Sequence, residues 1–194
     1  RILMEKVPSS ERFLTDIISA MRDFRVIRLC YQSFRHSEPF CFNVRPYCVK
    51  YFKQRWYLLG DSDLGLRIYS LDRFVDMEEL EEHFEIPKGF DAEEYFGNYF
   101  GVIIGEEPED VKIRVVPDQV KYFRTLPLHG SQRETVQEDG SSVFSYHIAP
   151  TFDFVQEILS HGADVEVLEP AELRESVADI IAGMASRYGL PVSR

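Results

Sequence analysis

A stretch rich in glutamate, glycine and proline, residues 81–110, separates two segments of the sequence that differ in pattern. Before it, one helical pattern precedes several short alternating runs; after it, helical and strand-like runs follow one another regularly. The stretch also holds the aromatic residues Phe90, Tyr95, Phe96, Tyr99 and Phe100. We therefore expect a linker that packs these rings, with a short helix at residues 91–99, and not a disordered segment. The sequence predicts two domains.

The first segment predicts one helix and a group of short strands. A serine N-cap followed by apolar residues at helical spacing indicates a helix over about residues 10–22. Period-two alternation predicts strands at residues 26–33, 43–51, 55–60, 67–71 and 73–80. Four or five short strands that follow a helix and are joined by tight turns are typical of a small barrel.

The second segment predicts a different arrangement of helices and strands. Strands are expected at residues 112–116, 132–137, 143–149 and 164–168, and helices at 117–124, 152–159 and 170–188. The order strand–helix–strand–strand–helix–strand with a final helix is that of the ferredoxin-like split arrangement. The predicted fold class is therefore α+β, a small barrel followed by a ferredoxin-like domain.

The charge of the chain is unevenly distributed. Residues 1–76 carry 13 Lys and Arg against 9 Asp and Glu, whereas residues 77–194 carry 9 against 24, within a net charge of −11. Free nucleic acid would be repelled by the whole molecule but not by its first part. The asymmetry indicates two functionally different pieces.

Several classes of protein are poor matches to this sequence. The uncharged stretches are too short to cross a bilayer, and no charged-then-apolar leader begins the chain. The three cysteines (Cys30, Cys41 and Cys48) contain no C-x-x-C pair, so we expect reduced thiols and a cytoplasmic location. Because the chain begins at Arg1, we expect the C-terminal portion of a longer protein.

Alternation along the strands of the first segment points to an anion-binding surface. Guanidinium groups bind phosphate bidentately, and tyrosine rings stack on bases. Trp56 and Leu58 are expected in the core instead, and strand arginines also serve in ion pairs, with Asp72 and Asp76 available to Arg73. The candidate ligand-binding residues are Tyr31, Ser33, Arg45, Arg55, Tyr57, Arg67, Tyr69 and Arg73.

Metal, cofactor and catalytic sites find little support. His36, Cys41 and Cys48 are irregularly spaced and lack an evident fourth ligand, so a zinc site is not expected. No glycine pattern matches a phosphate-binding loop. Ser131 and the histidines His129 and His147 lack a companion acid at a recognisable spacing. We expect no cofactor and no enzymatic activity.

A specific motif lies at Arg55-Trp56-Tyr57-Leu58-Leu59-Gly60. In its context, which includes Tyr31-Gln-Ser33, Arg45-Pro46-Tyr47 and Arg67-Ile-Tyr-Ser-Leu-Asp-Arg73-Phe, the sequence resembles the WYL domain family over residues 25–80. The second segment resembles the C-terminal extension that accompanies WYL domains. The motifs that carry this second resemblance are Tyr122-Phe-Arg, Leu128-His-Gly-Ser-Gln, Ile158-Leu-Ser-His-Gly and Val167-Leu-Glu-Pro-Ala-Glu-Leu-Arg174.

The resemblance implies the sensing region of a bacterial transcriptional regulator. It implies a connecting helix (residues 1–24), an Sm-like WYL barrel (25–80), a linker (81–110) and a ferredoxin-like extension (111–194). It further implies a homodimer, a nucleotide or single-stranded nucleic-acid effector, and DNA contact through an N-terminal winged helix-turn-helix domain that this chain lacks.

Two alternatives remain open at this point: a free-standing Sm-like module for single-stranded nucleic acid, and a ligand-free interaction domain whose arginines form structural ion pairs. The acidic run at residues 78–82 is expected to be a solvated face, with competition for the basic barrel as an alternative. In a crossed dimer of the kind that the family forms, Arg124, Arg133 and His129 could complete a partner's site.

Overall fold

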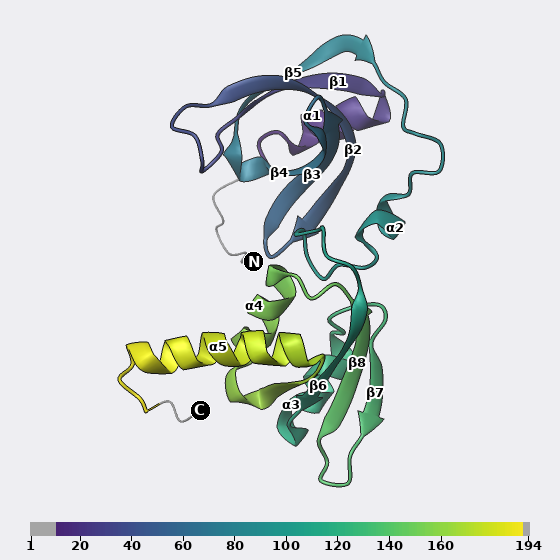
Figure 1. Ribbon diagram of the computed structural model, residues 1–194. Coiled ribbons are helices and arrows are strands. Elements are labelled where there is room, and N and C mark those ends of the chain that lie inside the picture. Colours follow the sequence, from purple (N-terminus) through teal and green to yellow (C-terminus); the bar gives the residue numbers. More distant parts are fainter. Residues whose placement is uncertain (1–10, 192–194) are drawn as a thin grey trace, which may run out of the picture. The chain divides into compact units, whose positions relative to one another are not determined.

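The computed structural model describes residues 11–191, and the chain divides after Ala92 into two compact units (Figure 1). Each unit contains helices and an antiparallel sheet, so the predicted α+β class is confirmed. The division falls inside the predicted linker. Within the described residues, no helix is long and apolar enough to span a membrane.

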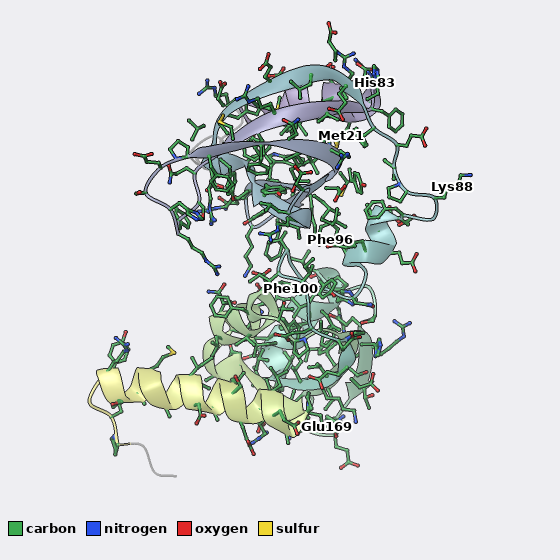
Figure 2. All side chains as sticks on the ribbon, turned by 45° about the horizontal axis from the view of Figure 1, so that its top comes forward. Met21, His83, Lys88, Phe96, Phe100 and Glu169 are labelled. Atoms are coloured by element: carbon green, nitrogen blue, oxygen red, sulfur yellow. A yellow bond between two sulfur atoms is a disulfide. The ribbon has the colours of Figure 1, made fainter. Side chains whose placement is uncertain are left out.

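The first unit is a helix followed by a five-stranded antiparallel sheet in the order β4-β3-β2-β1-β5. Its strands lie close to the predicted ranges, although the last strand extends beyond the predicted residue 80 and ends at His83 (Figure 2). Residues 1–10, and with them the start of the predicted connecting helix, lie outside the described part. The elements are α1 (Leu14–Arg22), β1 (Arg25–Tyr31), β2 (Phe40–Phe52), β3 (Arg55–Ser62), β4 (Gly65–Ser70), the 3-10 helix η1 (Leu71–Arg73) and β5 (Phe74–His83).

The sheet of the predicted small barrel does not close within residues 11–191, because β4 and β5 are both edge strands and no ladder joins them. In the chain, only the three-residue η1 lies between β4 at one edge of the sheet and β5 at the other. Because β5 pairs with β1, the sheet must curl to bring its two edges within this short reach. The result is a strongly curved open sheet.

The concave face of this sheet and α1 enclose the first core. Ile27, Leu29 and Tyr31 alternate along β1 and face Val44, Phe42 and Phe40 of β2. From α1, Ile17 and Ala20 are fully buried against them. Burying such apolar surface is the main stabilising contribution, about 25 cal/mol per Å².

The second unit contains a four-stranded antiparallel sheet in the order β7-β8-β6-β9. Its helices and strands again follow the predicted order. They are α2 (Ala92–Phe96), β6 (Glu109–Val115), α3 (Pro117–Thr125), β7 (Arg133–Val136), β8 (Ser142–Ile148), α4 (Phe152–Ser160), the 3-10 helix η2 (Gly162–Asp164), β9 (Val165–Glu169) and α5 (Ala171–Arg187).

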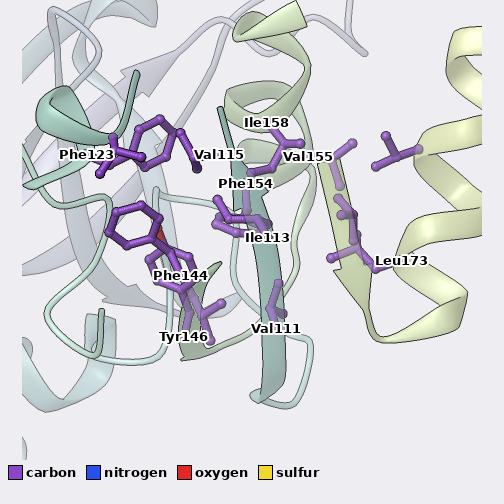
Figure 3. Close-up of a cluster of buried hydrophobic side chains, with 14 residues drawn as sticks. Val111, Ile113, Val115, Phe123, Phe144, Tyr146, Phe154, Val155, Ile158 and Leu173 are labelled. Atoms are coloured by element: carbon purple, nitrogen blue, oxygen red, sulfur yellow. The ribbon is translucent and has the colours of Figure 1, made fainter. Parts of the chain in front are cut away.

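The core of the second unit is a separate cluster in which Phe144 of β8 lies beside Phe123 of α3 (Figure 3). The linker also packs its rings, as expected. Phe90 contacts Tyr47 in the first unit at 5.0 Å between ring centroids, and Phe100 contacts Phe154 in the second at 6.0 Å.

Gly60 in the middle of β3 is a position where a side chain does not fit. A Cβ there would lie 2.4 Å from Val44 Cγ1 and 3.1 Å from the Arg45 carbonyl oxygen. We expect Gly60→Ala to destabilise the first unit by about 1–3 kcal/mol, since overpacking forces neighbours to shift. Denaturant unfolding followed by fluorescence of Trp56, the only tryptophan, measures this.

A matched glycine replacement serves as the control. Gly183 lies exposed within α5, and nothing lies within 4 Å of a Cβ added there. Gly183→Ala should stabilise the helix by about 0.5–1 kcal/mol. Equal effects of the two substitutions would contradict the tight packing of Gly60.

Candidate anion-binding site

A hollow of about 750 Å³ lies at one corner of the first unit, where loop 32–39 between β1 and β2 meets the turn between β3 and β4. We refer to it as the corner hollow. Its lining is rich in basic side chains from the loop and from β4. It consists of Arg35, His36, Ser37, Glu38, Pro39, Phe40, Leu64 and Arg67.

Loop 32–39 is held by local hydrogen bonds of its own polar residues. The Gln32 side-chain amide donates to the carbonyls of Ser33 (3.1 Å) and His36 (2.7 Å). The Ser33 hydroxyl accepts from the backbone N–H of Arg35 at 3.1 Å. Ser33 therefore shapes the loop, and Arg35 and His36 stay exposed beside the hollow.

Arg67 reaches the hollow from β4. Its Nε donates to the Leu64 carbonyl at 3.0 Å, which orients the guanidinium group over the β3–β4 turn. Among residues 11–191, no carboxylate forms an ion pair with Arg67 or with Arg35. With one glutamate, Glu38, against two guanidinium groups, the lining has net positive charge.

Arg73 contacts Phe34, the aromatic residue of loop 32–39. Its guanidinium carbon lies 3.8 Å from the centroid of the Phe34 ring, a cation–π contact, and Phe34 is 80% exposed. The Arg73 Nε atom is buried without a hydrogen-bond partner in the described part of the chain. Arg73 therefore anchors the loop next to Arg35 rather than pairing with Asp76.

Tyr31 and Tyr69, two of the predicted ligand contacts, are core residues. Both are at least nine-tenths buried, and their rings meet edge to face at 5.6 Å between centroids. The Tyr69 hydroxyl shares a hydrogen bond with the Ser62 hydroxyl at 3.2 Å. These tyrosines support the wall behind the site but offer little surface to a ligand.

The remaining predicted residues lie on the opposite face of the sheet. In the ladder between β3 and β4, Leu58 faces Tyr69 and Tyr57 faces Ser70, so Arg55 and Tyr57 point away from the side of Arg67 and Tyr69. On that outer face Arg55 pairs with Asp72 (3.0 Å). The expected single surface is thus two surfaces, and the structure does not bring these residues together.

Arg45 likewise has a carboxylate partner, Asp61 at 3.1 Å. Ion pairs of this half-exposed kind contribute little to stability, about 0–1 kcal/mol. They do, however, partly neutralise the charge that the outer face offers to an anion. The hollow, whose arginines have no carboxylate partner among residues 11–191, is therefore the better candidate for an anion site.

Sequence reasoning missed Arg35 and His36, which line the hollow, and their neighbour Phe34. All three follow the Tyr31-Gln-Ser33 motif directly, in a segment with no strand alternation. The signal that could have found them is the presence of two cationic groups and an aromatic ring in one short loop at a strand end.

The cysteines differ from the expectation of reduced thiols. Cys30 of β1 and Cys41 of β2 form a disulfide, and only Cys48 is free. Burial raises the pKa of the Cys48 thiol. No group of three or more metal-ligating side chains lies within residues 11–191.

The serine and histidines of the second unit have structural contacts. The Ser131 hydroxyl accepts from the His147 backbone N–H at 3.0 Å and lies 2.8 Å from His129 Nδ1. His129 Nε2 lies 2.8 Å from the Gly97 carbonyl, while His147 pairs with Asp110 instead. These bonds tie the loop before β7 to neighbouring backbone.

Other charged groups of interest are also paired. The acidic run of β5 lies along an edge strand, with Glu79 paired to Arg25 at 3.4 Å, and negative charge on an edge discourages strand addition. Arg124 makes a bidentate contact with Glu134 at 2.7 and 2.8 Å. Neither group contacts the corner hollow in the described residues.

The buried tyrosines predict a loss of stability at alkaline pH. Burial raises the pKa values of Tyr31 and Tyr69 above their ordinary value, although nearby Arg73 opposes the rise at Tyr31. Because the folded pKa exceeds the unfolded one, their contribution is complete below about pH 10 and is lost as the pH rises through the folded values.

Denaturant unfolding of the whole chain, followed by Trp56 fluorescence, measures this pH dependence, because Trp56 lies in the first unit. We expect the free energy of unfolding to fall as the pH rises above about 10, the ordinary tyrosine value, and through the raised pKa values of the folded state. In the Tyr69→Phe variant the fall should be smaller, because one of the two phenols no longer ionises. An unchanged fall in that variant would contradict the assignment.

Comparison with known proteins adds independent information. Residues 12–79 match the WYL domain and residues 107–185 match the WCX domain. No curated protein matches the chain. Among solved structures, 16 chains match it.

Two of these solved structures differ in TM-score and in the share of their own length that is matched. A CRISPR Cas-related protein is 17% identical with a TM-score of 0.53, over 91% of this chain and 51% of that chain; this likeness shows the fold. Proteasome accessory factor B/C (PafBC) of Arthrobacter aurescens is 20% identical with a TM-score of 0.39, over 95% of this chain and 28% of that chain. This chain thus spans about half of the first and about a quarter of the second.

Proposed function

Because this chain belongs to the WYL domain family and carries a WCX domain after its WYL domain, we propose that it is the effector-sensing part of a bacterial transcriptional regulator. The effector is an anionic, phosphate-bearing ligand, namely a nucleotide or a short single-stranded nucleic acid. The role is one of binding, without catalysis, in the cytoplasm.

The observation that supports this proposal is the corner hollow with Arg35 and Arg67, for which residues 11–191 provide no carboxylate partner. A hollow of about 750 Å³ is within the usual range for small-ligand sites. Arginine forks match phosphate oxygens in geometry, and the exposed Phe34 offers a face on which a base can stack. The hollow would supply the phosphate contacts of a nucleotide, and Phe34, which precedes Arg35 in the loop, the stacking contact.

Regulation requires that the effector favour one of two states of the protein. Loop 32–39 is the element suited to this, because a ligand between Arg35 and Arg67 bridges the loop and β4. A loop closed on the ligand would differ from an open one, and the difference would pass to an attached DNA-binding domain through the dimer.

The finer folds and the dimer are part of the proposal. The curled sheet with its short η1 corner supports an Sm-like WYL domain, and the order β7-β8-β6-β9 supports a ferredoxin-like extension. For self-association, α5 presents Ile181 and Met184, and Tyr188 follows at its C-cap; each is at least half exposed. Such an apolar face is typical of an interaction surface.

Fluorescence anisotropy with short labelled single-stranded oligonucleotides and cyclic nucleotides tests the proposal. We expect saturable binding that weakens by about tenfold when salt rises fourfold, since two or three phosphate contacts release counterions. Absence of binding at low salt by the folded protein would reject it.

The outer-face ion pairs Arg45–Asp61 and Arg55–Asp72 favour a second candidate, a ligand-free interaction domain. In that case replacing these arginines would lower stability with no binding to lose. A full-length gene that lacks a helix-turn-helix would favour instead the third candidate, a free-standing Sm-like nucleic-acid module.

A further inference from the structure

The two bonded cysteines lie directly opposite each other in adjacent strands. In the ladder between β1 and β2, Cys30 faces Cys41, and their Cα atoms are 4.0 Å apart. Because Leu29 and Tyr31 point into the core, alternation puts Cys30 on the outer face. Cys30 is half-buried and Cys41 is exposed, so a small reagent can reach the pair.

The position of the pair along the strands is specific. Only one ladder pair, Tyr31 with Phe40, lies between the disulfide and loop 32–39. The bond therefore sits at the neck of the loop whose Arg35 and His36 line the corner hollow. Closing this short loop removes conformational freedom from its ends.

The sheet does not depend on the bond for its register. Pairs from Ile27 with Val44 to Leu29 with Phe42 continue the ladder away from the loop, and β5 pairs with the other edge of β1. These apolar residues are largely buried. The two sulfur atoms consequently remain neighbours when the bond opens, which is the condition for reversible closure.

We propose that Cys30 and Cys41 are a reversible thiol–disulfide pair whose closure holds loop 32–39, and with it the corner hollow, in one shape. Its effect on effector affinity rests on the proposed function. Loss of the bond leaves the loop secured by its own hydrogen bonds, by the bond from the Gln32 backbone N–H to the Arg73 carbonyl (3.0 Å) and by the Phe34–Arg73 contact.

Closure proceeds by exchange with a small-molecule disulfide. The exposed Cys41 thiolate attacks one sulfur of that reagent, forms a mixed disulfide and expels one thiolate. The Cys30 thiolate then attacks the Cys41 sulfur and expels the second thiolate. The protein loses two protons and two electrons, and the reagent is reduced to two thiols. Excess small thiol reverses both steps.

The test uses the Cys48→Ser variant, in which the pair holds the only cysteines of the chain. After reduction and removal of reductant, thiol titration should find both sulfhydryls; after oxidised glutathione, none, with a mass decrease of about 2 Da. Two remaining thiols, or stable glutathione adducts, would overturn the proposal.

Limited proteolysis then reads the loop itself without any ligand. Trypsin should cleave after the exposed Arg35 about tenfold faster in the reduced protein than in the oxidised one, because cleavage follows local opening. Cleavage after Arg187 at the end of α5 is the internal control and should not change. Equal rates after Arg35 would show that the bond does not hold the loop.

Anisotropy with the labelled oligonucleotide completes the set. We expect the oxidised protein to bind several-fold more tightly than the reduced one, because a pre-ordered loop costs less to fix. Equal affinities would overturn the link to binding. Absence of binding in either state would reject the proposed function alone. Thiol titration and proteolysis would still decide whether the pair closes reversibly and holds the loop.

Discussion

The double variant Arg35→Ala with Arg67→Ala should lose about a hundredfold of its affinity for a single-stranded oligonucleotide. Each arginine faces the corner hollow, and neither is paired with a carboxylate in residues 11–191. A charge-assisted hydrogen bond contributes about 1.5–3 kcal/mol, so two such losses at the lower end of this range, suited to exposed side chains, amount to roughly two orders of magnitude. Anisotropy titration measures the change, with thermal unfolding to show that the variant is folded.

A matched pair of arginines on the outer face provides the control. Arg45→Ala with Arg55→Ala removes the same charge, but these side chains already pair with Asp61 and Asp72. We expect affinity to change by less than about threefold and stability to fall by about 0–1 kcal/mol per pair. If both double variants lose affinity equally, binding depends on overall charge and not on the hollow.

Replacement of Phe144 should have the largest effect on stability. Phe144 is fully buried at the centre of the second core, with its ring centroid 5.5 Å from that of Phe123 (Figure 3). Phe144→Ala should cost about 3–5 kcal/mol, since the transfer free energy of the ring and the cavity left behind add together. Circular dichroism during denaturation, with Trp56 fluorescence recorded in parallel, separates the two units.

Comparison of circular dichroism with Trp56 fluorescence tests whether the loss of stability is confined to the second unit. The Trp56 transition should stay unchanged, because Phe144 belongs to the core of the second unit only. Phe144→Leu, which fills part of the space, should cost less than Phe144→Ala because it leaves a smaller cavity. A shift of the Trp56 transition as large as that of the second unit would contradict two separate cores.

Elements with a clear period were predictable from the sequence. The alternation of Ile27, Leu29 and Tyr31 places a strand, and their burial confirms the face that packs. The strands predicted at residues 43–51 and 55–60 leave room only for a tight turn between them, and Lys53 and Gln54 there both adopt positive φ, which suits a two-residue hairpin turn. Local pattern is sufficient for such features because the chain neighbours alone determine them.

Features that depend on strand register were not predictable. Alternation gives two faces for each strand but does not say which faces of different strands coincide. The separation of Arg55 from Arg67 follows only from the pairing of Leu58 with Tyr69. The same holds for the Cys30–Cys41 bond, whose partners lie 11 residues apart and face each other only in the observed register.

Loop 32–39 escaped the sequence analysis for a different reason. Its residues follow no period, and its shape depends on side-chain bonds such as Gln32 to the His36 carbonyl. The charge of Arg35 was visible in the sequence, but its position beside Arg67 required the fold. The site residues that were missed are therefore those placed by tertiary contacts.

Amide chemical-shift mapping during titration with a short single-stranded oligonucleotide tests the central claim most directly. We expect saturable shifts at Arg35, His36 and Arg67, which line the corner hollow, and unchanged signals at Arg55 and Tyr57 on the outer face. Shifts confined to the outer face or to the second unit would contradict the assignment of the hollow as the effector site.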